Sequence, residues 1–173
     1  MTGAANILVA YGTKNGSTAE IADVIADTLR AAGPRCEVRP AADVRDVTEY
    51  DAVVLGGALY AGRWHRDAVR FARRHRKALA GRPVWLFSSG PLDPSAGERD
   101  IPPVRGAARA AAHLDAREHI TFGGCLKEGA RGFLARMILK QGKGGDFRDM
   151  DRIRAWARGT AKEIEASMAS QQP

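Results

Sequence analysis

The stretch VAYGTKNGSTAEIA, Val9 to Ala22, decides how this chain folds. An apolar run ends at Gly12, and small polar residues follow before a helical pattern begins. The first N–H groups of a helix have no partner within the helix, and the helix dipole favours negative charge there. Gly12 and Gly16 let the backbone approach a ligand, and the side chains between them add neutral donors. The stretch therefore predicts a strand, a phosphate-binding loop and a helix.

Two common nucleotide-binding motifs do not match this loop. It lacks the Gly-Lys-Ser/Thr ending of a P-loop, and it lacks the third glycine and the downstream acid of the dinucleotide fingerprint. Ser17 with Glu20 three residues later matches a capping box. A capped helix after a polar turn is thus the alternative to a phosphate site, and the loop by itself leaves both open.

Outward from the loop, apolar strand-like segments alternate with helical ones. Strands are expected at Ile7–Tyr11, Arg35–Arg39, Asp51–Ala58, Pro83–Ser88 and His119–Cys125, and helices at Ser17–Ala32, Arg66–Ala80, Val104–Ala116 and Asp149–Met168. The ends, Met1–Asn6 and Ala166–Pro173, are expected to fray. Strands that are apolar without alternation are typical of a parallel sheet with helices on both faces. Five such strands fit an α/β doubly wound sheet in the order 2-1-3-4-5, with ligands at the carboxyl ends of the strands.

Length and composition set further limits. The 173 residues suffice for one domain, expected to span residues 1–173. No apolar run is long enough to cross a membrane, and no signal peptide is recognised. Cys36 and Cys125 are far apart and fit free thiols in a reducing cytoplasm, where we expect the protein. No cluster of acids, cysteines or histidines predicts a metal site.

The net charge of +7 is unevenly distributed. The run RWHRDAVRFARRHRK, Arg63 to Lys77, holds seven Lys or Arg against one Asp. Such a run favours an anionic partner, either a nucleic acid, an acidic lipid surface or a small molecule, or it is a solvated helix face. No zinc spacing, RNA-binding aromatic motif or basic zipper supports a nucleic-acid partner, so none is expected.

Three loops carry a resemblance to a known family. GTKNGSTAEIA resembles the flavodoxin signature T-x-T-G-x-T, with Asn15 where the family usually has Thr. YDAVVLGGALYAGRWH resembles the second flavin loop of that family, and PVWLFSSGPL its third strand-loop unit. The resemblance implies a flavodoxin-like fold and FMN as cofactor. It places the phosphate at Thr13, Lys14, Asn15, Gly16, Ser17 and Thr18, and the flavin ring between Ala58, Leu59, Tyr60, Ala61, Gly62 and Arg63 on one side and Ser89, Gly90, Pro91 and Leu92 on the other.

Two aromatic residues near the second loop could stack on the flavin ring. Tyr60 is the preferred candidate because it lies inside the loop, and Trp64 is the other. Ordinary core packing just past a strand end is the alternative role for Tyr60.

The later sequence resembles one branch of the family. Gly57 to His65 reads G-x-x-x-x-G-x-x-H, and Gly144-Gly145-Asp146 precedes the last helix, as in the flavodoxin-like, menaquinone-dependent protoporphyrinogen dehydrogenases. A basic insert at about residues 126–148 separates the fifth strand from that helix. Its segment Phe133–Lys143 is expected to form a short basic amphipathic helix.

This resemblance implies an FMN-dependent oxidoreductase that moves two electrons between an organic substrate, such as a porphyrinogen, and a quinone. Arg63 and Arg66 are candidates for substrate carboxylates, and His65 is a candidate for proton transfer or for the same carboxylates. The insert would cover the flavin edge, touch the inner membrane face, or pack on the fold. Two alternatives stay open: a flavodoxin-like electron-transfer protein without its own substrate, and a binding domain for another ligand. The sequence does not predict an oligomeric state.

Overall fold

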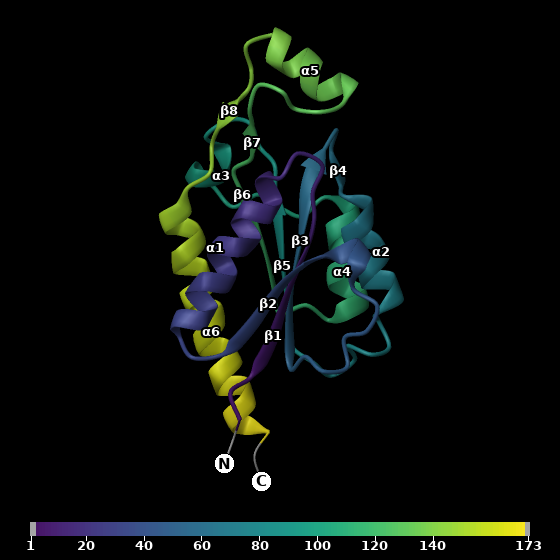
Figure 1. The fold of residues 1–173 in the computed structure, drawn as a ribbon, viewed down its shortest axis with the longest axis vertical. Helices are drawn as coiled ribbons and strands as arrows, with labels where there is room; N and C mark the ends of the chain where they lie inside the picture. Colours follow the sequence, from purple (N-terminus) through teal and green to yellow (C-terminus); the bar gives the residue numbers. More distant parts are fainter. Residues whose placement is uncertain (1–2, 172–173) are drawn as a thin grey trace.

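Five parallel strands form the central sheet of the protein, in the order β2-β1-β3-β5-β6 (Figure 1). The computed structural model describes residues 3–171. The strands are β1 (Asn6–Gly12), β2 (Arg35–Pro40), β3 (Ala52–Tyr60), β5 (Val84–Ser89) and β6 (Glu118–Phe122). Numbered among themselves, they have the predicted order 2-1-3-4-5, so the expected α/β doubly wound sheet is confirmed.

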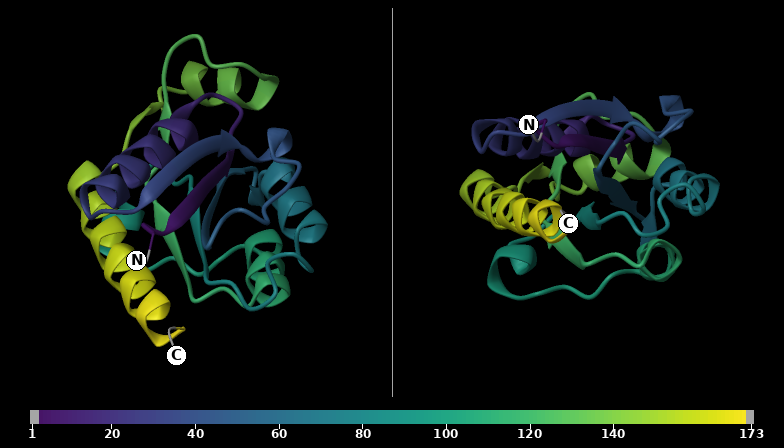
Figure 2. Two further views of the ribbon diagram at one scale, coloured as in Figure 1. Left: turned by 60° about the horizontal axis from the view of Figure 1, so that its bottom comes forward. Right: turned by 90° about the horizontal axis from the view of Figure 1, so that it is seen from below.

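Helices cover both faces of this sheet (Figures 1 and 2). Helices α1 (Ser17–Ala31) and α6 (Met150–Ser170) lie on one face, and α2 (Arg66–Arg74) and α4 (Arg105–Leu114) lie on the other. The shorter elements are η1 (Ala41–Asp43), β4 (Arg63–Trp64), α3 (Ser95–Glu98), β7 (Cys125–Leu126), α5 (Phe133–Lys140) and β8 (Gly145–Asp146). Strand β4 pairs with the end of β3, and β7 pairs with β8, both antiparallel.

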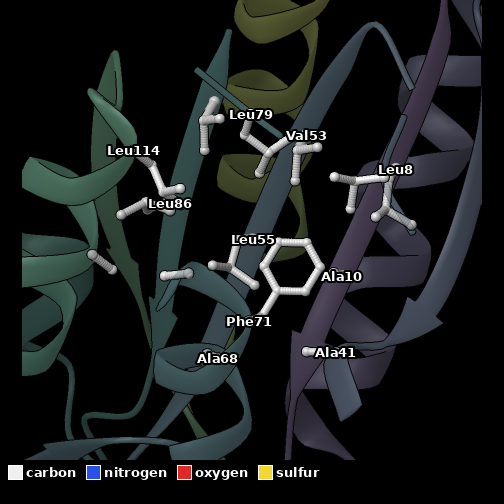
Figure 3. Close-up of a cluster of buried hydrophobic side chains, with 14 of the residues drawn as sticks. Leu8, Ala10, Ala41, Val53, Leu55, Ala68, Phe71, Leu79, Leu86 and Leu114 are labelled. Carbon is white, nitrogen blue, oxygen red and sulfur yellow. The ribbon is translucent and has the colours of Figure 1, made fainter. Parts of the chain in front are cut away.

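The apolar strands fill two cores because successive side chains point to opposite faces. Ile7 and Val9 of β1 pack with α1 and α6, whereas Leu8 of the same strand packs with α2 and α4. Figure 3 shows the core on the face of α2 and α4, in which Phe71 of α2 packs against the strands of the sheet. Burial on both faces explains why these strands do not alternate apolar and polar residues.

Several predicted boundaries were wrong. Helix α2 ends at Arg74 rather than at residue 80. The next residue, His75, is held in the core, because its ring packs against Phe71 and its Nε2 lies 3.3 Å from the carbonyl oxygen of Val44. Strand β6 ends at Phe122, since a side chain at Gly123 would meet the backbone of Phe147 at 1.9 Å. The chain leaves the sheet there and places residue 125 in β7.

The expected fraying at the chain ends was also too extensive. Strand β1 begins at Asn6 and helix α6 continues to Ser170, so residues 166–170 are helical. Residues 1–2 and 172–173 of that expectation lie outside the described residues, and residues 3–5 and 171 belong to no helix or strand. Between residues 3 and 171, no helix combines the length and the apolar character needed to cross a membrane.

Candidate functional site

The loops that follow β1, β3 and β5 line one cleft at the carboxyl ends of the strands. The cleft has a volume of about 940 Å³. Of the sixteen residues predicted to surround FMN, fifteen line it, and Gly16 is the exception. This clustering follows from topology, because neighbouring parallel strands all end at the same edge of a sheet.

The first loop ends in a helix N-terminus without a side-chain cap. Gly16 is the N-cap residue, with φ of 88°, and no side-chain hydrogen bond caps α1 within the described residues. The predicted capping box at Ser17 was therefore wrong. The left-handed Gly16 places Ser17 inside the helix, and Glu20 pairs with Arg148 instead. The first N–H groups of α1 thus remain available to a ligand.

Two hydroxyls at this helix end are buried without a partner. Thr18 is fully buried, and neither its Oγ1 nor the Oγ of Ser17 has a hydrogen-bond partner in the part of the chain that the structure describes. Thr13 has a different role, because its Oγ1 accepts a hydrogen bond from the N–H of Gly16 at 3.0 Å and shapes the loop. A buried hydroxyl without a partner is unfavourable, so these two donors fit a bound anion such as a phosphate.

Tyr60 lies between the first loop and α5. The Lys14 ammonium is 4.5 Å from the centre of its ring, and its hydroxyl accepts a hydrogen bond from the N–H of Ala135 at 3.1 Å. Trp64, the other candidate for stacking, is only 4% exposed and belongs to the core that faces α2. Trp64 packs against the backbone of Gly57, which leaves no room for a side chain there. Trp64 also lines the cleft, but its burial makes it the weaker stacking candidate, and Tyr60 stays the preferred one.

His65 caps helix α2. Its Nδ1 accepts a hydrogen bond from the N–H of Asp67 at 3.2 Å, which leaves the proton of the neutral ring on Nε2. Burial lowers the pKa of His65, and Asp67 opposes this shift only in part. The ring also explains Gly12, since a side chain there would approach Nδ1 to 2.7 Å. A neutral His65 with one nitrogen already bonded has only Nε2 left for proton transfer.

Arginines mark the mouth of the cleft. Arg63 of β4 and Arg66 at the start of α2 line the cleft and are exposed. Further along the basic run, the arginines of α2 face solvent while Phe71 and Ala72 face the core. The basic run is therefore the outer face of an amphipathic helix that begins at the cleft.

The segment between β6 and α6 is fastened to the loops of the cleft. The N–H of Arg131 donates to the Oδ1 of Asn15 at 2.8 Å. Arg148, with a side chain only 3% exposed, binds both Glu20 of α1 and Asp146 of β8. Hydrogen bonds from Arg148 lower the pKa of Asp146 to about 2. With the bond between Ala135 and Tyr60, three separate contacts hold this segment at the end of the sheet where α5 lies (Figure 1).

Helix α5 has an inner and an outer face. Leu134 and Ile138 line the cleft, and Phe133 and Met137 are exposed at 79% and 39%. No other large apolar side chain is exposed within residues 3–171. The basic amphipathic helix predicted at Phe133–Lys143 therefore forms, although it ends at Lys140.

Sequence reasoning missed part of the cleft lining. Gly124, Cys125 and Leu126 follow β6, and Leu134 and Ile138 come from α5. Burial raises the pKa of the Cys125 thiol, which keeps it protonated near neutral pH. The position of β6 next to β5 was the signal that could have placed the residues after it in the cleft.

Comparisons with known proteins agree with this geometry. The family described as "Flavodoxin domain" matches residues 8–145. The chain belongs to the flavodoxin domain family. Membership implies FMN binding and a flavodoxin-type redox role, as expected from the loops. The uncapped end of α1 and its free hydroxyls fit the phosphate of FMN.

Two solved structures are similar across almost the whole chain. A flavodoxin from the domain Archaea is 12% identical with a TM-score of 0.61, and the match covers 92% of this chain and 99% of that one. The rubredoxin oxygen:oxidoreductase of Desulfovibrio gigas is 10% identical with a TM-score of 0.65, covering 95% of this chain and 37% of that one. At these identities the likeness shows the fold alone.

A sequence relative is more specific but partial. The protoporphyrinogen IX dehydrogenase [quinone] of Escherichia coli K12 is 30% identical over 86 residues. The match covers 47% of this chain and 46% of that protein. The chain thus spans about half the length of the curated relative that it matches.

Proposed function

We propose that this protein is an FMN-dependent oxidoreductase that transfers two electrons from an organic substrate of the porphyrinogen class to a quinone. The observation that carries the proposal is that Leu134 and Ile138 of α5 line the cleft in which we place the flavin. An electron carrier needs only an accessible flavin edge, whereas a large apolar substrate needs an apolar wall. The partial likeness to a protoporphyrinogen dehydrogenase supports the same substrate class.

The cofactor would be held by the three loops. Residues 13–18 bind its phosphate through the N–H groups of α1 and the hydroxyls of Ser17 and Thr18. Residues 58–63 and 89–92 lie along the two sides of the ring, with Tyr60 as the stacking side chain. FMN, when bound, supplies the redox centre for the transfer.

The residues at the mouth would position the substrate. Arg63 and Arg66 are exposed and free to pair with substrate carboxylates, for which the arginine fork is well suited. The lowered pKa of His65 favours the neutral ring, and Nδ1 accepts the N–H of Asp67, so His65 would offer its Nε2–H to the substrate as a hydrogen-bond donor. Two electrons and two protons leave the substrate in each turnover, and the quinone gains both to become a quinol.

The insert at residues 126–148 would belong to this one domain and bring it to the membrane that holds the quinone. Phe133 and Met137 give α5 an exposed apolar face, and Arg136 and Lys140 flank it with charge. Such a helix suits the interface of an anionic bilayer. A peripheral position at the inner membrane face fits these features.

An anaerobic assay tests the activity. Protein loaded with FMN is mixed with protoporphyrinogen and a soluble quinone, and porphyrin fluorescence is followed against a control with free FMN. Fluorescence that rises only with protein is the expected result. Arg63→Gln should raise KM for the porphyrinogen about tenfold through one lost charge pair, whereas Arg109→Gln on α4 should not.

A flat fluorescence trace with FMN bound would overturn the substrate assignment. Stepwise reduction then decides whether the protein is an electron carrier. Reduction that pauses after one electron would favour the carrier, while a single two-electron step would keep an oxidoreductase with another substrate.

A further inference from the structure

A second cavity lies beside the phosphate loop. It has a volume of about 350 Å³ and shares Lys14, Asn15 and Ser17 with the cleft. Its other wall comes from residues 127–131, which follow β7. The hydrogen bond from the Arg131 N–H to Asn15 holds this wall against the loop across 116 positions of sequence. Two distant segments therefore enclose the end of α1.

The unpartnered hydroxyls mark this place as a ligand site. The buried Ser17 Oγ lacks a hydrogen-bond partner in the described residues, and Ser17 lines the second cavity as well as the cleft. The fully buried Thr18 Oγ1 also lacks a hydrogen-bond partner in the described residues, and Thr18 lines the cleft. Donors that are left free on both sides of one helix end point to a single acceptor-rich ligand between them.

The charges of the cavity select the ligand class. Lys14, Lys127 and Arg131 line it, and so do the carboxylates of Glu20 and Glu128. Glu20 is paired with the buried Arg148, whereas Glu128 makes no ion pair within residues 3–171. With Arg148 and its second carboxylate, Asp146, included, four cations stand against three carboxylates, and the remaining positive charge favours an anion such as a phosphate monoester.

We propose that Lys127 and Arg131 form a second, cationic wall for the phosphate group of FMN. This inference rests on the FMN site proposed above and goes beyond it, because it makes the insert part of cofactor recognition. The first wall supplies the N–H groups and hydroxyls of α1, and the second supplies charge. The protein then selects a flavin for its phosphate through both hydrogen bonds and charge.

Flavin titration tests the second wall. The dissociation constants of FMN and riboflavin are measured by fluorescence quenching for the full chain and for Lys127→Gln combined with Arg131→Gln. Both side chains are exposed, and the backbone bond of Arg131 to Asn15 does not depend on its side chain. FMN should bind about tenfold more weakly to the double variant, with riboflavin unchanged. Lys77→Gln, an exposed cation that lines neither cavity, is the control and should change neither constant.

A variant of opposite sign and a competing anion sharpen the test. Glu128→Gln removes the opposing carboxylate and should tighten FMN binding severalfold. The inhibition constant of inorganic phosphate against FMN should be lower for the original protein than for the double variant, and added salt should reduce this difference.

The outcomes separate this inference from the proposed function. If the original protein binds FMN and the double variant binds it equally well, the second wall is refuted and the FMN site stands. Equal weakening for FMN and riboflavin would also refute it, because the loss would not depend on the phosphate. If the original protein binds neither flavin, the FMN site and the second wall both fall.

Discussion

Thr18→Val is expected to change two measurable quantities in opposite directions. Thr18 is fully buried, and its Oγ1 has no hydrogen-bond partner within the described part of the chain. Valine has nearly the same shape but no hydroxyl. A buried hydroxyl without a partner costs ~1–3 kcal/mol, so the substitution should raise the free energy of unfolding of the FMN-free protein by about 1 kcal/mol. For a chain of this length, that gain corresponds to a rise in Tm of roughly 2–4 °C.

The same substitution should weaken FMN binding. A hydrogen bond to a charged acceptor contributes ~1.5–3 kcal/mol, so losing the Thr18 donor should raise the Kd for FMN by about tenfold or more. Flavin fluorescence quenching gives the Kd, and urea denaturation of the FMN-free protein gives the free energy of unfolding. A stabilised protein that binds its cofactor less well is the signature of a donor held ready for a ligand.

Thr160→Val is the matched control. Thr160 is also buried, but its Oγ1 donates to the carbonyl oxygen of Trp156 at 3.1 Å and the residue does not line the cleft. Valine there should lower the free energy of unfolding by about 0.5–1.5 kcal/mol and leave the Kd for FMN unchanged. The reasoning is refuted if Thr18→Val destabilises the FMN-free protein as Thr160→Val does, or if it leaves FMN affinity intact.

Three further substitutions test other parts of the structure. Burial lowers the pKa of His119 from 6.5 to about 4, so its contribution to the free energy of unfolding is complete above about pH 6.5. This contribution should fall by about 3 kcal/mol as the pH falls to 4, and His119→Asn should flatten the profile in urea denaturation. Arg148→Gln breaks both ion pairs of a buried guanidinium and should cost about 1–2 kcal/mol, with faster tryptic cleavage within residues 127–143. Phe133→Ser with Met137→Ser should reduce flotation with anionic vesicles about tenfold, whereas the control Ala112→Ser, at an exposed position of α4, should not. Unchanged flotation of the double variant, or an equal effect of the control, would argue against α5 as the membrane face.

The sheet and most of the cleft could be predicted because their signals are local. Continuous apolar runs such as Ala52–Leu55 identify strands that are buried on both faces. The order of parallel strands then places the loops after β1, β3 and β5 at one edge without any knowledge of side-chain contacts. This is why fifteen of the sixteen predicted residues line a single cleft.

The errors came from contacts between residues that are distant in sequence. Helix α2 ends where the His75 ring contacts the carbonyl oxygen of Val44, 31 positions earlier in the sequence. The predicted capping box at Ser17 satisfies the local pattern, but Glu20 is drawn to Arg148, 128 positions away. Local spacing contains no information about such partners, so a pattern that is correct in form can have a different role in the fold.

The contacts of the insert have a thermodynamic consequence for the cofactor. Asn15 and Tyr60 belong to the predicted FMN loops, and each also binds the backbone of the insert, at Arg131 and Ala135. A ligand that orders these loops therefore favours the docked insert, and a docked insert favours the ligand by the same free energy. If a membrane surface binds α5 more tightly in the docked insert than in the undocked one, that surface also strengthens cofactor binding. Vesicles should then lower the Kd for FMN of the original protein but not that of Phe133→Ser with Met137→Ser. Such a difference would show that the outer face of α5 is coupled to the phosphate loop through the insert.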